Sequence, residues 1–253
     1  MIKISNVSYK ISNEFELKEL NLTINPGVHH LLGPNGAGKT SLLNLISGLC
    51  AVDKGSILIK DLEVDPLNLR ALSKVRAYLL QKQTAHFALT VKAMLTITLS
   101  LTDKEIDKLC ENNIIIKGLD LKPLLNRVIT GLSGGETQRA HLARVLLHCA
   151  QEINPASCLL LDEPFTGLDV AHKLWLNQYL SLLGECITII ISHHELNLAL
   201  NLAQPCIIIN KGRIHSILSD SRDIERTTLL DVFNLPVAAL IETNEGILQI
   251  IGI

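Results

Sequence analysis

Residues 33–40 read Gly33-Pro34-Asn35-Gly36-Ala37-Gly38-Lys39-Thr40 and match the phosphate-loop pattern G-x-x-x-x-G-K-[ST]. The apolar run 28–32 precedes them, as expected where a strand passes into a helix. In such a loop backbone N–H groups surround the phosphates, while Lys39 can reach the outer phosphates and Thr40 can offer its hydroxyl to Mg²⁺. The stretch therefore predicts a nucleoside triphosphate site. The predicted nucleotide-binding residues are Gly33, Pro34, Asn35, Gly36, Ala37, Gly38, Lys39, Thr40 and Ser41.

The chain has 253 residues, enough for one α/β domain with insertions. It carries 23 Lys and Arg against 25 Asp and Glu, so its charge gives no reason to expect nucleic acid as a partner. The six cysteines form no C-x-x-C pair, and we expect them to be small core residues in a reducing compartment. No leader-like N-terminus is visible, and no stretch reaches the roughly 18 apolar residues of a membrane span. We therefore expect a protein that stays in the cytosol.

The first half of the chain changes from strand patterns to helix patterns. Alternating apolar and polar residues predict short strands at 3–7, 20–24 and 55–60. A helical subdomain is expected over approximately 84–145, with helices at 91–101 and 103–112. The second of these helices opens with a possible capping box, Thr102-x-x-Glu105.

The second half alternates between apolar strands and helices. A helical pattern covers 137–150, and the later predicted segments are 158–161, 171–183, 186–191, 195–203 and 206–209. Strands that alternate with helices in this way indicate a buried, mostly parallel sheet. The last part, 237–253, predicts a β-hairpin with its turn at 243–246.

Two carboxylates follow the apolar strand 158–161. Asp162 and Glu163 are expected at the carboxyl edge of the sheet, where the phosphate loop also lies. Asp162 fits the role of holding Mg²⁺, and Glu163 fits that of polarising the water that attacks the γ-phosphate. The plain alternative is an apolar strand that ends in exposed acids. The phosphate loop makes that alternative the less favoured one.

A second motif, Leu132-Ser133-Gly134-Gly135-Glu136, precedes the helical pattern 137–150. Its Ser133-x-x-Glu136 spacing alone indicates an ordinary capped helix start. Together with Asp162 and Glu163 downstream, however, it resembles the signature motif of the ATP-binding cassette family. Gln81 resembles the Q-loop glutamine of that family, the segment 166–169 its D-loop, and His193 its switch histidine. The motifs follow in the family's order, and the resemblance covers most of the chain.

The resemblance implies a fold and a set of roles. The fold would be the α/β phosphate-loop ATPase domain of the family, one domain spanning 1–253, with a mostly parallel core sheet, an N-terminal antiparallel β subdomain and an inserted α-helical subdomain. Glu163, His193 and Gln81 would be catalytic, and Thr40, Gln81 and Asp162 would serve the Mg²⁺ that accompanies ATP. Two chains would form a head-to-tail homodimer, in which Leu132, Ser133, Gly134, Gly135 and Glu136 face the partner's ATP, and Asp169 would be the D-loop residue.

Several positions depart from the family pattern or leave alternatives open. Glu136 stands where the family most often has Gln, and His194 where many members have Asp. Neither Tyr9 nor Phe15 lies at the usual distance for the aromatic residue that stacks on adenine, so the adenine contact stays open. The pairs 29–30 and 193–194 are adjacent histidines, which point to opposite faces of a strand and do not suggest a shared metal ion.

Within the family, the segments 76–84, 154–157 and 192–197 resemble the ATP-binding subunits of bacterial vitamin B12 importers. This resemblance implies a peripheral protein at the cytoplasmic face of the inner membrane. Two transmembrane permease subunits would be its partners, docked near 81–94, and a periplasmic binding protein would be an indirect partner. Vitamin B12 would be the cargo; haem and iron-siderophore importers share much of this layout.

Two other classes of protein remain as alternatives. A soluble cassette ATPase acting on ribosomes or DNA would normally show fused cassettes, a long coiled-coil insertion or a basic surface. A phosphate-loop kinase or GTPase would not account for 132–136. The segment Asn210-Lys211-Gly212 lacks the Asp of a guanine-reading motif and is better explained as a hairpin turn.

Overall fold

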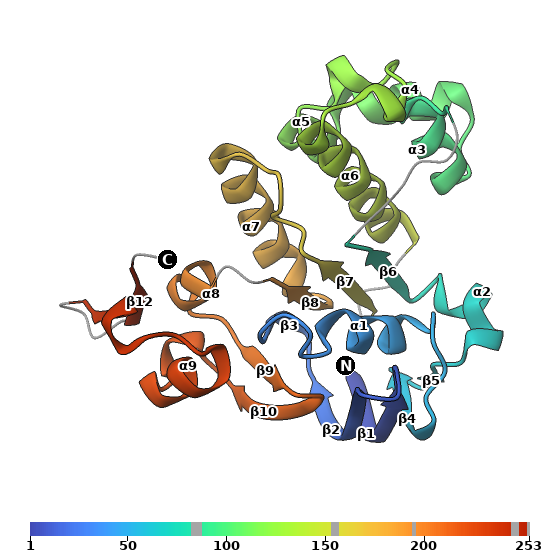
Figure 1. The fold of residues 1–253 in the computed structure, drawn as a ribbon. Coiled ribbons are helices and arrows are strands. Elements are labelled where there is room, and N and C mark those ends of the chain that lie inside the picture. Colours follow the sequence, from blue (N-terminus) through green and yellow to red (C-terminus); the bar gives the residue numbers. More distant parts are fainter. Residues whose placement is uncertain (82–87, 153–156, 194–195, 244–247, 252–253) are drawn as a thin grey trace.

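The computed structural model describes residues 1–81, 88–152, 157–193, 196–243 and 248–251. A six-stranded sheet with the order β10-β9-β3-β8-β7-β6 lies at its centre (Figure 1). All neighbours in it pair in parallel except β10, which is antiparallel to β9. The expected mostly parallel core sheet is therefore confirmed. Its strands are β3 (Gly27–Leu32), β6 (Arg76–Leu79), β7 (Cys158–Asp162), β8 (Thr188–Ser192), β9 (Cys206–Asn210) and β10 (Arg213–Leu218).

Both faces of the inner strands β7, β8 and β9 are buried, which explains why these strands read as continuous apolar runs. Along β7, Leu159 and Leu161 point into a cluster shared with the helical subdomain, whereas Cys158 and Leu160 point into a cluster shared with the N-terminal sheet. Side chains that alternate along a strand thus join two separate cores.

An antiparallel sheet with the order β2-β1-β4-β5 covers one side of the molecule, as expected. Its strands are β1 (Ile2–Lys10), β2 (Glu16–Ile24), β4 (Lys54–Ile59) and β5 (Leu62–Glu63). The first two are longer than the predicted strands. The pairing of β1 with β2 shifts register between Ile4 and Val7 and again before Tyr9. These irregularities break the alternation on which the prediction relied. The helix α1 (Lys39–Ser47) packs between the two sheets.

Helices form a separate layer above the core sheet (Figure 1). They are α3 (Val91–Leu99), α4 (Asp103–Asn112), α5 (Ile114–Gly118) and α6 (Gly134–Glu152). The capping box that joins Thr102 and Glu105 at the start of α4 is confirmed. The first helix ends at Leu99, earlier than predicted, because Ser100 adopts a left-handed conformation with φ of 52°. The start of the expected subdomain, 84–87, lies outside the described residues.

The short elements that connect these layers are α2 (Leu69–Leu72) and the 3₁₀ turns η1 (Pro66–Asn68), η2 (Lys122–Leu124) and η3 (Ile129–Gly131). Within the described ranges, no helix combines the length and the apolar character needed to cross a bilayer.

The C-terminal part flanks the core sheet on the side of β9 and β10 (Figure 1). It contains α8 (Leu196–Leu202), η4 (Ser221–Asp223), α9 (Arg226–Phe233), η5 (Val237–Ala239), β11 (Leu240–Glu242) and β12 (Leu248–Ile250). The helix α7 (Val170–Gly184) lies instead against β3 and β8, in the core that these strands share with the helical layer. The strands β11 and β12 pair antiparallel. The segment 237–239 is a 3₁₀ turn and not the start of the predicted strand, and 244–247 lies outside the described residues. Asn197 on α8 exchanges two hydrogen bonds of 2.8 Å with the backbone of Ile250, so the hairpin is fixed to this helix.

The turn after β9 has the geometry of a tight hairpin. Lys211 and Gly212 both have positive φ, 47° and 74°. This confirms the interpretation of 210–212 as a hairpin turn. The expectation that all six cysteines are core residues was wrong: four are buried and Cys50 is half-buried, but Cys186 is exposed, because it lies in the turn between α7 and β8.

Gly118 at the end of α5 provides a test of this packing. A Cβ added there would lie 1.9 Å from the ring of Trp175 on α7, and that ring stacks on Tyr179 with centroids 5.2 Å apart. Since the indole would have to give up this stacked position to make room, we expect Gly118→Ala to lower the free energy of unfolding by about 1–3 kcal/mol. Urea unfolding followed by the fluorescence of Trp175, the single tryptophan, measures this change.

The control is Gly131→Ala, because a Cβ at Gly131 meets no atom within 4 Å. Its unfolding free energy should stay within about 0.5 kcal/mol of the wild-type value. Equal stability of the Gly118 variant and this control would contradict the packing described here.

Candidate nucleotide-binding and catalytic site

A cavity of about 470 Å³ opens at the carboxyl end of β3 and the start of α1. The residues that line it come from the phosphate loop, from the turn between β1 and β2, and from the ends of β6 and β7. They are Ile11, Phe15, Asn35, Gly36, Gly38, Lys39, Thr40, Ser41, Gln81 and Glu163. The structure thus brings together most of the predicted nucleotide site with two of the three predicted catalytic residues.

The phosphate loop lies tightly against the strands beside it. A Cβ at Gly33 would lie 2.3 Å from the carbonyl oxygen of Ile209 on β9, and one at Gly38 would lie 2.6 Å from the side chain of Leu17 on β2. Gly38 also has a φ of 108°, which favours glycine. The helix α1 has neither a side-chain cap nor an acidic residue in its first turn, so its N-terminal N–H groups can serve an anion in the cavity.

Lys39 is folded over this loop. Its Nζ donates to the carbonyl oxygens of Gly33 at 2.6 Å and Pro34 at 3.2 Å. Burial lowers the pKa of Lys39, while the charges of Glu163 and Asp162 act in the opposite direction. A buried ammonium group that is already removed from bulk water is well suited to a phosphate ligand.

Asp162 ends β7 and is only 1% exposed. Its Oδ1 accepts a short hydrogen bond from the hydroxyl of Ser192, whereas its Oδ2 accepts none within the described part of the chain. Burial raises the pKa of Asp162, and hydrogen bonds from Ser192 and Thr40 partly offset this. A buried carboxylate oxygen with unused acceptor capacity beside a threonine hydroxyl fits a hard cation such as Mg²⁺.

Glu163 follows directly in a strained conformation. Its φ is 53°, which is unusual for a residue other than glycine. Its backbone N–H donates to the carbonyl oxygen of Ser192 at 3.0 Å, and the Nε2 of Gln138 donates to the next carbonyl, of Pro164, at 3.2 Å. These contacts hold the strained turn that directs Glu163 into the cavity. Sequence reasoning did not identify Ser192 and Gln138.

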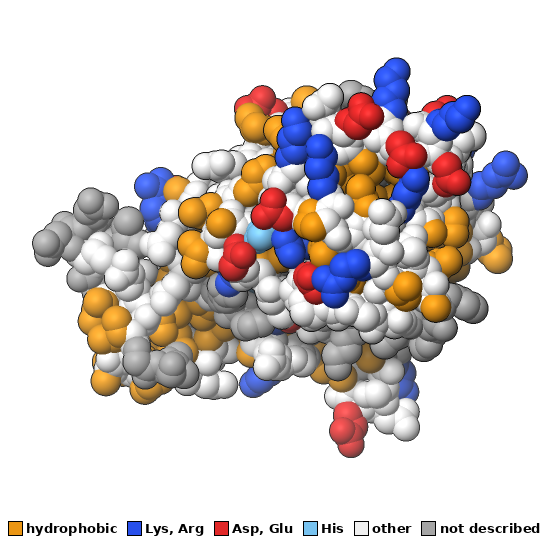
Figure 2. All heavy atoms as spheres, turned by 90° about the horizontal axis from the view of Figure 1, so that it is seen from above, with side chains coloured by type: hydrophobic (Ala, Val, Ile, Leu, Met, Phe, Trp, Pro, Cys, Tyr) orange, Lys and Arg blue, Asp and Glu red, His pale blue; other side chains and the backbone are white. Residues whose placement is uncertain are grey.

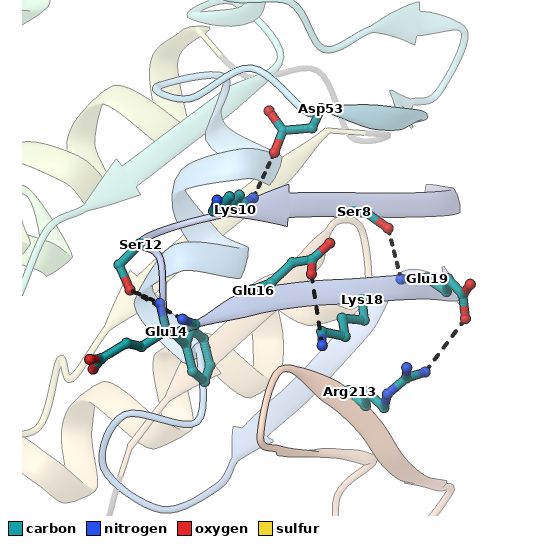
Figure 3. A network of polar contacts seen from close by, with 10 residues as sticks. Ser8, Lys10, Ser12, Glu14, Glu16, Lys18, Glu19, Asp53 and Arg213 are labelled. Carbon is teal, nitrogen blue, oxygen red and sulfur yellow. Dashed lines mark hydrogen bonds and ion pairs between the residues drawn. The ribbon is translucent and has the colours of Figure 1, made fainter.

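Phe15 lines the cavity and Tyr9 does not. The turn that presents Phe15 is built on Ser12, whose Oγ accepts from the N–H groups of Glu14 at 3.2 Å and Phe15 at 3.1 Å (Figure 3). Tyr9 is half-buried and packs against the core that lies between the sheets, and a hydrogen bond with Cys50, followed by burial, raises its pKa. The structure therefore places Phe15, and not Tyr9, at the nucleotide cavity.

The segment 132–136 contributes nothing to the lining of this cavity. Ser133 is exposed at the start of α6, and the capping box predicted there is confirmed: the Glu136 carboxylate accepts from the N–H of Ser133 at 2.8 Å. The same carboxylate pairs with Arg127 at 2.6 Å, a partner that the sequence did not indicate. Gly135 touches the predicted D-loop, since a Cβ there would lie 2.7 Å from the carbonyl oxygen of Gly167.

Asp169 forms the N-cap of α7. It accepts from the backbone N–H of His172 at 2.9 Å and lies 2.8 Å from the Nδ1 of the same residue. These hydrogen bonds lower the pKa of Asp169. Its carboxylate therefore stays charged at the surface near the segment 132–136.

His193 does not line the cavity, in contrast to Gln81 and Glu163. It is 3% exposed, and its Nε2 lies 2.9 Å from the Nδ1 of His30 on β3. His194 lies outside the described residues. The adjacent histidines 29 and 30 point apart, as expected, because His29 contacts the carbonyl oxygen of Asn25 at 3.0 Å while His30 is completely buried.

Comparisons with known proteins agree with this geometry. Residues 17–166 match the family model described as ABC transporter. The hemin import ATP-binding protein HmuV of Photobacterium damsela subsp. piscicida is 34% identical over 246 residues, covering 94% of this chain and 91% of that protein. The vitamin B12 import ATP-binding protein BtuD of Vibrio atlanticus is 34% identical over 254 residues, covering 97% and 98%.

The fold itself recurs among solved structures. The ATP-binding cassette MJ0796, in a dimeric post-hydrolysis state bound to ADP and Pi, has a TM-score of 0.74 at 24% identity, covering 88% of this chain and 100% of that chain. The ATPase fold expected from the resemblance is thereby confirmed.

The position of Phe15 predicts its contribution to binding. Phe15→Leu keeps apolar bulk but removes the ring. We therefore expect the free energy of ATP binding to become less favourable by about 1–3 kcal/mol, the usual contribution of a base stacked on an aromatic ring. Titration with a fluorescent adenine nucleotide measures the change. Tyr9→Leu is the matched control and should leave the affinity unchanged; a larger loss at Tyr9 than at Phe15 would show that the turn is misassigned.

Proposed function

This chain belongs to the ABC transporter family as an ATP-binding subunit, and from that membership we propose that it powers the uptake of vitamin B12 at the cytoplasmic face of a bacterial inner membrane. Membership carries ATP hydrolysis coupled to transport. The observation that most supports vitamin B12 is the alignment with the BtuD protein of Vibrio atlanticus along nearly the whole of both chains.

Hemin is the second candidate cargo. The HmuV relative is as similar in identity as the BtuD relative, although it aligns over a slightly smaller share of both chains. The cavity described above is lined by the phosphate loop, Phe15, Gln81 and Glu163, so it would serve ATP and carries no information about the cargo. Cargo therefore has to be tested by transport.

Hydrolysis would depend on residues that meet at the carboxyl edge of the core sheet. Lys39 and the N–H groups of α1 would hold the phosphates of ATP, and Glu163 would polarise the attacking water. Thr40, Gln81 and Asp162 would hold Mg²⁺, which when bound would neutralise charge on the phosphates. The unused Oδ2 of the buried Asp162 supports this last assignment.

A second copy of the chain would complete the site. The N-terminus of α6 is an anion-binding feature that its own cavity does not use, and Ser133 is exposed there. We assign Leu132–Glu136 and Asp169 to the ATP of the partner in a head-to-tail homodimer. Glu136 is occupied by Ser133 and Arg127 of its own chain, so the serine hydroxyl and the glycine backbone would make the contact.

Two permease subunits would dock near the segment 81–94, of which 82–87 lies outside the described residues. Leu89 within this segment is 36% exposed, and Leu80 and Ile97 on either side of it are exposed to 39% and 65%. On the face that carries the helical subdomain, hydrophobic side chains reach the surface between charged ones of both signs (Figure 2). A mixed surface of this kind suits a protein partner better than a nucleic acid. A periplasmic binding protein would act only through the permease.

Two substitutions test the ATPase mechanism. Lys39→Ala should abolish productive ATP binding, because each hydrogen bond to a charged group contributes about 1.5–3 kcal/mol. Glu163→Gln should retain ATP but slow its hydrolysis by about 10²–10⁴-fold and hold the closed dimer. Size-exclusion chromatography with light scattering and a phosphate-release assay measure both effects. The control is Glu185→Gln, at an exposed position after α7, which should leave ATP binding and hydrolysis unchanged. A Glu163→Gln chain that stays monomeric with ATP would refute the dimer mechanism.

Transport of the cargo is tested by uptake of labelled vitamin B12 and labelled hemin in cells that lack this gene and its paralogues. We expect loss of vitamin B12 uptake, rescued by the wild-type chain but not by Glu163→Gln, with hemin uptake unchanged. The reverse pattern would replace vitamin B12 by hemin and leave the ATPase assignment intact.

A further inference from the structure

Two buried histidine rings meet near the carboxyl ends of β3 and β8. His30 lies on β3 and is 0% exposed, and His193 follows β8 and is 3% exposed. The Nδ1 of His30 and the Nε2 of His193 are 2.9 Å apart, and the two rings meet edge to face with an interplanar angle of 77°. Phe165 flanks His193 in a similar edge arrangement at 6.3 Å. The ring of His193 is thus held between two others.

Hydrogen bonds behind this pair determine where its protons lie. On α7 the hydroxyl of Ser181 donates to the carbonyl oxygen of Asn177 at 3.0 Å, so its oxygen can only accept the 3.3 Å bond from the Nε2 of Gln204. The Oε1 of Gln204 therefore faces His30 and accepts from its Nε2 at 2.7 Å. With a proton on Nε2, the Nδ1 of a neutral His30 must be an acceptor, and the Nε2 of His193 donates to it.

His30 is suited to this accepting role. Burial lowers the pKa of His30 to about 4, so the ring is neutral at physiological pH and keeps one lone pair. The backbone N–H of His30 also donates to the carbonyl oxygen of Pro205 at 2.8 Å, which ties the strand to the loop that carries Gln204. Both the ring and its orienting amide are therefore fixed to the core sheet.

We propose that His30, ordered by Gln204, is a positioning residue for His193: it holds one ring nitrogen of His193 so that the ring meets the γ-phosphate of ATP in a single orientation. This inference rests on the proposed role of His193 in ATP binding. A histidine held at one nitrogen presents the other in one direction only, as in systems where a buried acceptor orients a catalytic imidazole. Because its Nε2 proton is donated to His30, His193 can donate to the phosphate only as an imidazolium, which carries a proton on both nitrogens; His30 still accepts in that state.

The strand β3 connects the two functions directly, because it carries His30 and ends at the phosphate loop. A purely structural role of His30 would therefore affect the whole loop and weaken the binding of ATP and ADP together. A role through His193 would affect the γ-phosphate alone, which ADP lacks. The ratio of the affinities for a triphosphate and a diphosphate separates the two roles.

The experiment measures the dissociation constants of the β,γ-imido analogue of ATP and of ADP by calorimetry on the full chain. His30→Leu should lower the triphosphate preference by about tenfold, the size of one hydrogen bond to a charged group. Its affinity for ADP should stay within about twofold of wild type. His30→Asn, which keeps an acceptor near the place of Nδ1, should restore most of the preference.

Two further variants complete the design. In a His193→Ala background His30→Leu should lower the preference no further, because the two residues act as one unit. Gln204→Leu, in the half-buried loop before β9, should change the preference in the same direction even if His30→Leu fails to fold. His29→Leu is the matched control on the same strand and should leave both affinities unchanged.

The outcomes distinguish this inference from the proposed function. If His193→Ala lowers the triphosphate preference but His30→Leu and Gln204→Leu do not, His30 is not a positioning residue and the ATPase assignment stands. An equal loss of triphosphate and ADP affinity would also overturn the inference, in favour of a structural role. If His193→Ala itself leaves the preference unchanged, the proposed role of His193 fails first.

Discussion

The parallel pairing of β3 with β8, and of β8 with β7, is the constraint on which the rest of the structure depends. In this register Ser192 lies opposite both Leu31 and Asp162, so three strand ends stop at the same edge of the sheet. The phosphate loop, the two carboxylates and His193 then follow within a few residues of that edge. A slip of one residue in any of these pairs would turn buried side chains to the opposite face. The site is therefore as well determined as the core.

Burial also determines the electrostatics of this edge. It lowers the pKa of Lys39 and raises that of Asp162, so both groups are held where their charged forms lack water. The charge of each group partly offsets the cost of burying the other, and a bound phosphate with its cation would offset the rest. A preorganised site of this kind loses little free energy to reorganisation when charge arrives. The strain at Glu163, with φ of 53°, belongs to the same arrangement, since the Ser192 and Gln138 contacts hold it.

Local patterns predicted the parts of the fold that local interactions determine. The phosphate loop, the apolar strands β7 and β8 and both capping boxes were visible in the sequence, because each depends on residues close along the chain. The strand β10 and the helix α9 were not predicted. In β10 the exposed fraction alternates, but Ser216 lies on the more buried side and Ile217 on the exposed side, so the apolar residues do not follow the alternation. The position of Phe15 depends on the turn at Ser12, and the contact between His30 and His193 joins residues far apart in sequence. Pairings of that kind follow only from the register of the sheet.

Gly135 and Gly167 lie in direct backbone contact, closer than any side chain would permit. The start of α6 and the loop before α7 are therefore in direct contact, with no side chain between Gly135 and Gly167. A rotation of the helical layer against the core sheet has to carry this loop along or break the contact. A side chain larger than hydrogen at Gly135 would therefore push apart the start of α6 and the loop before α7, two segments that are far apart in the sequence.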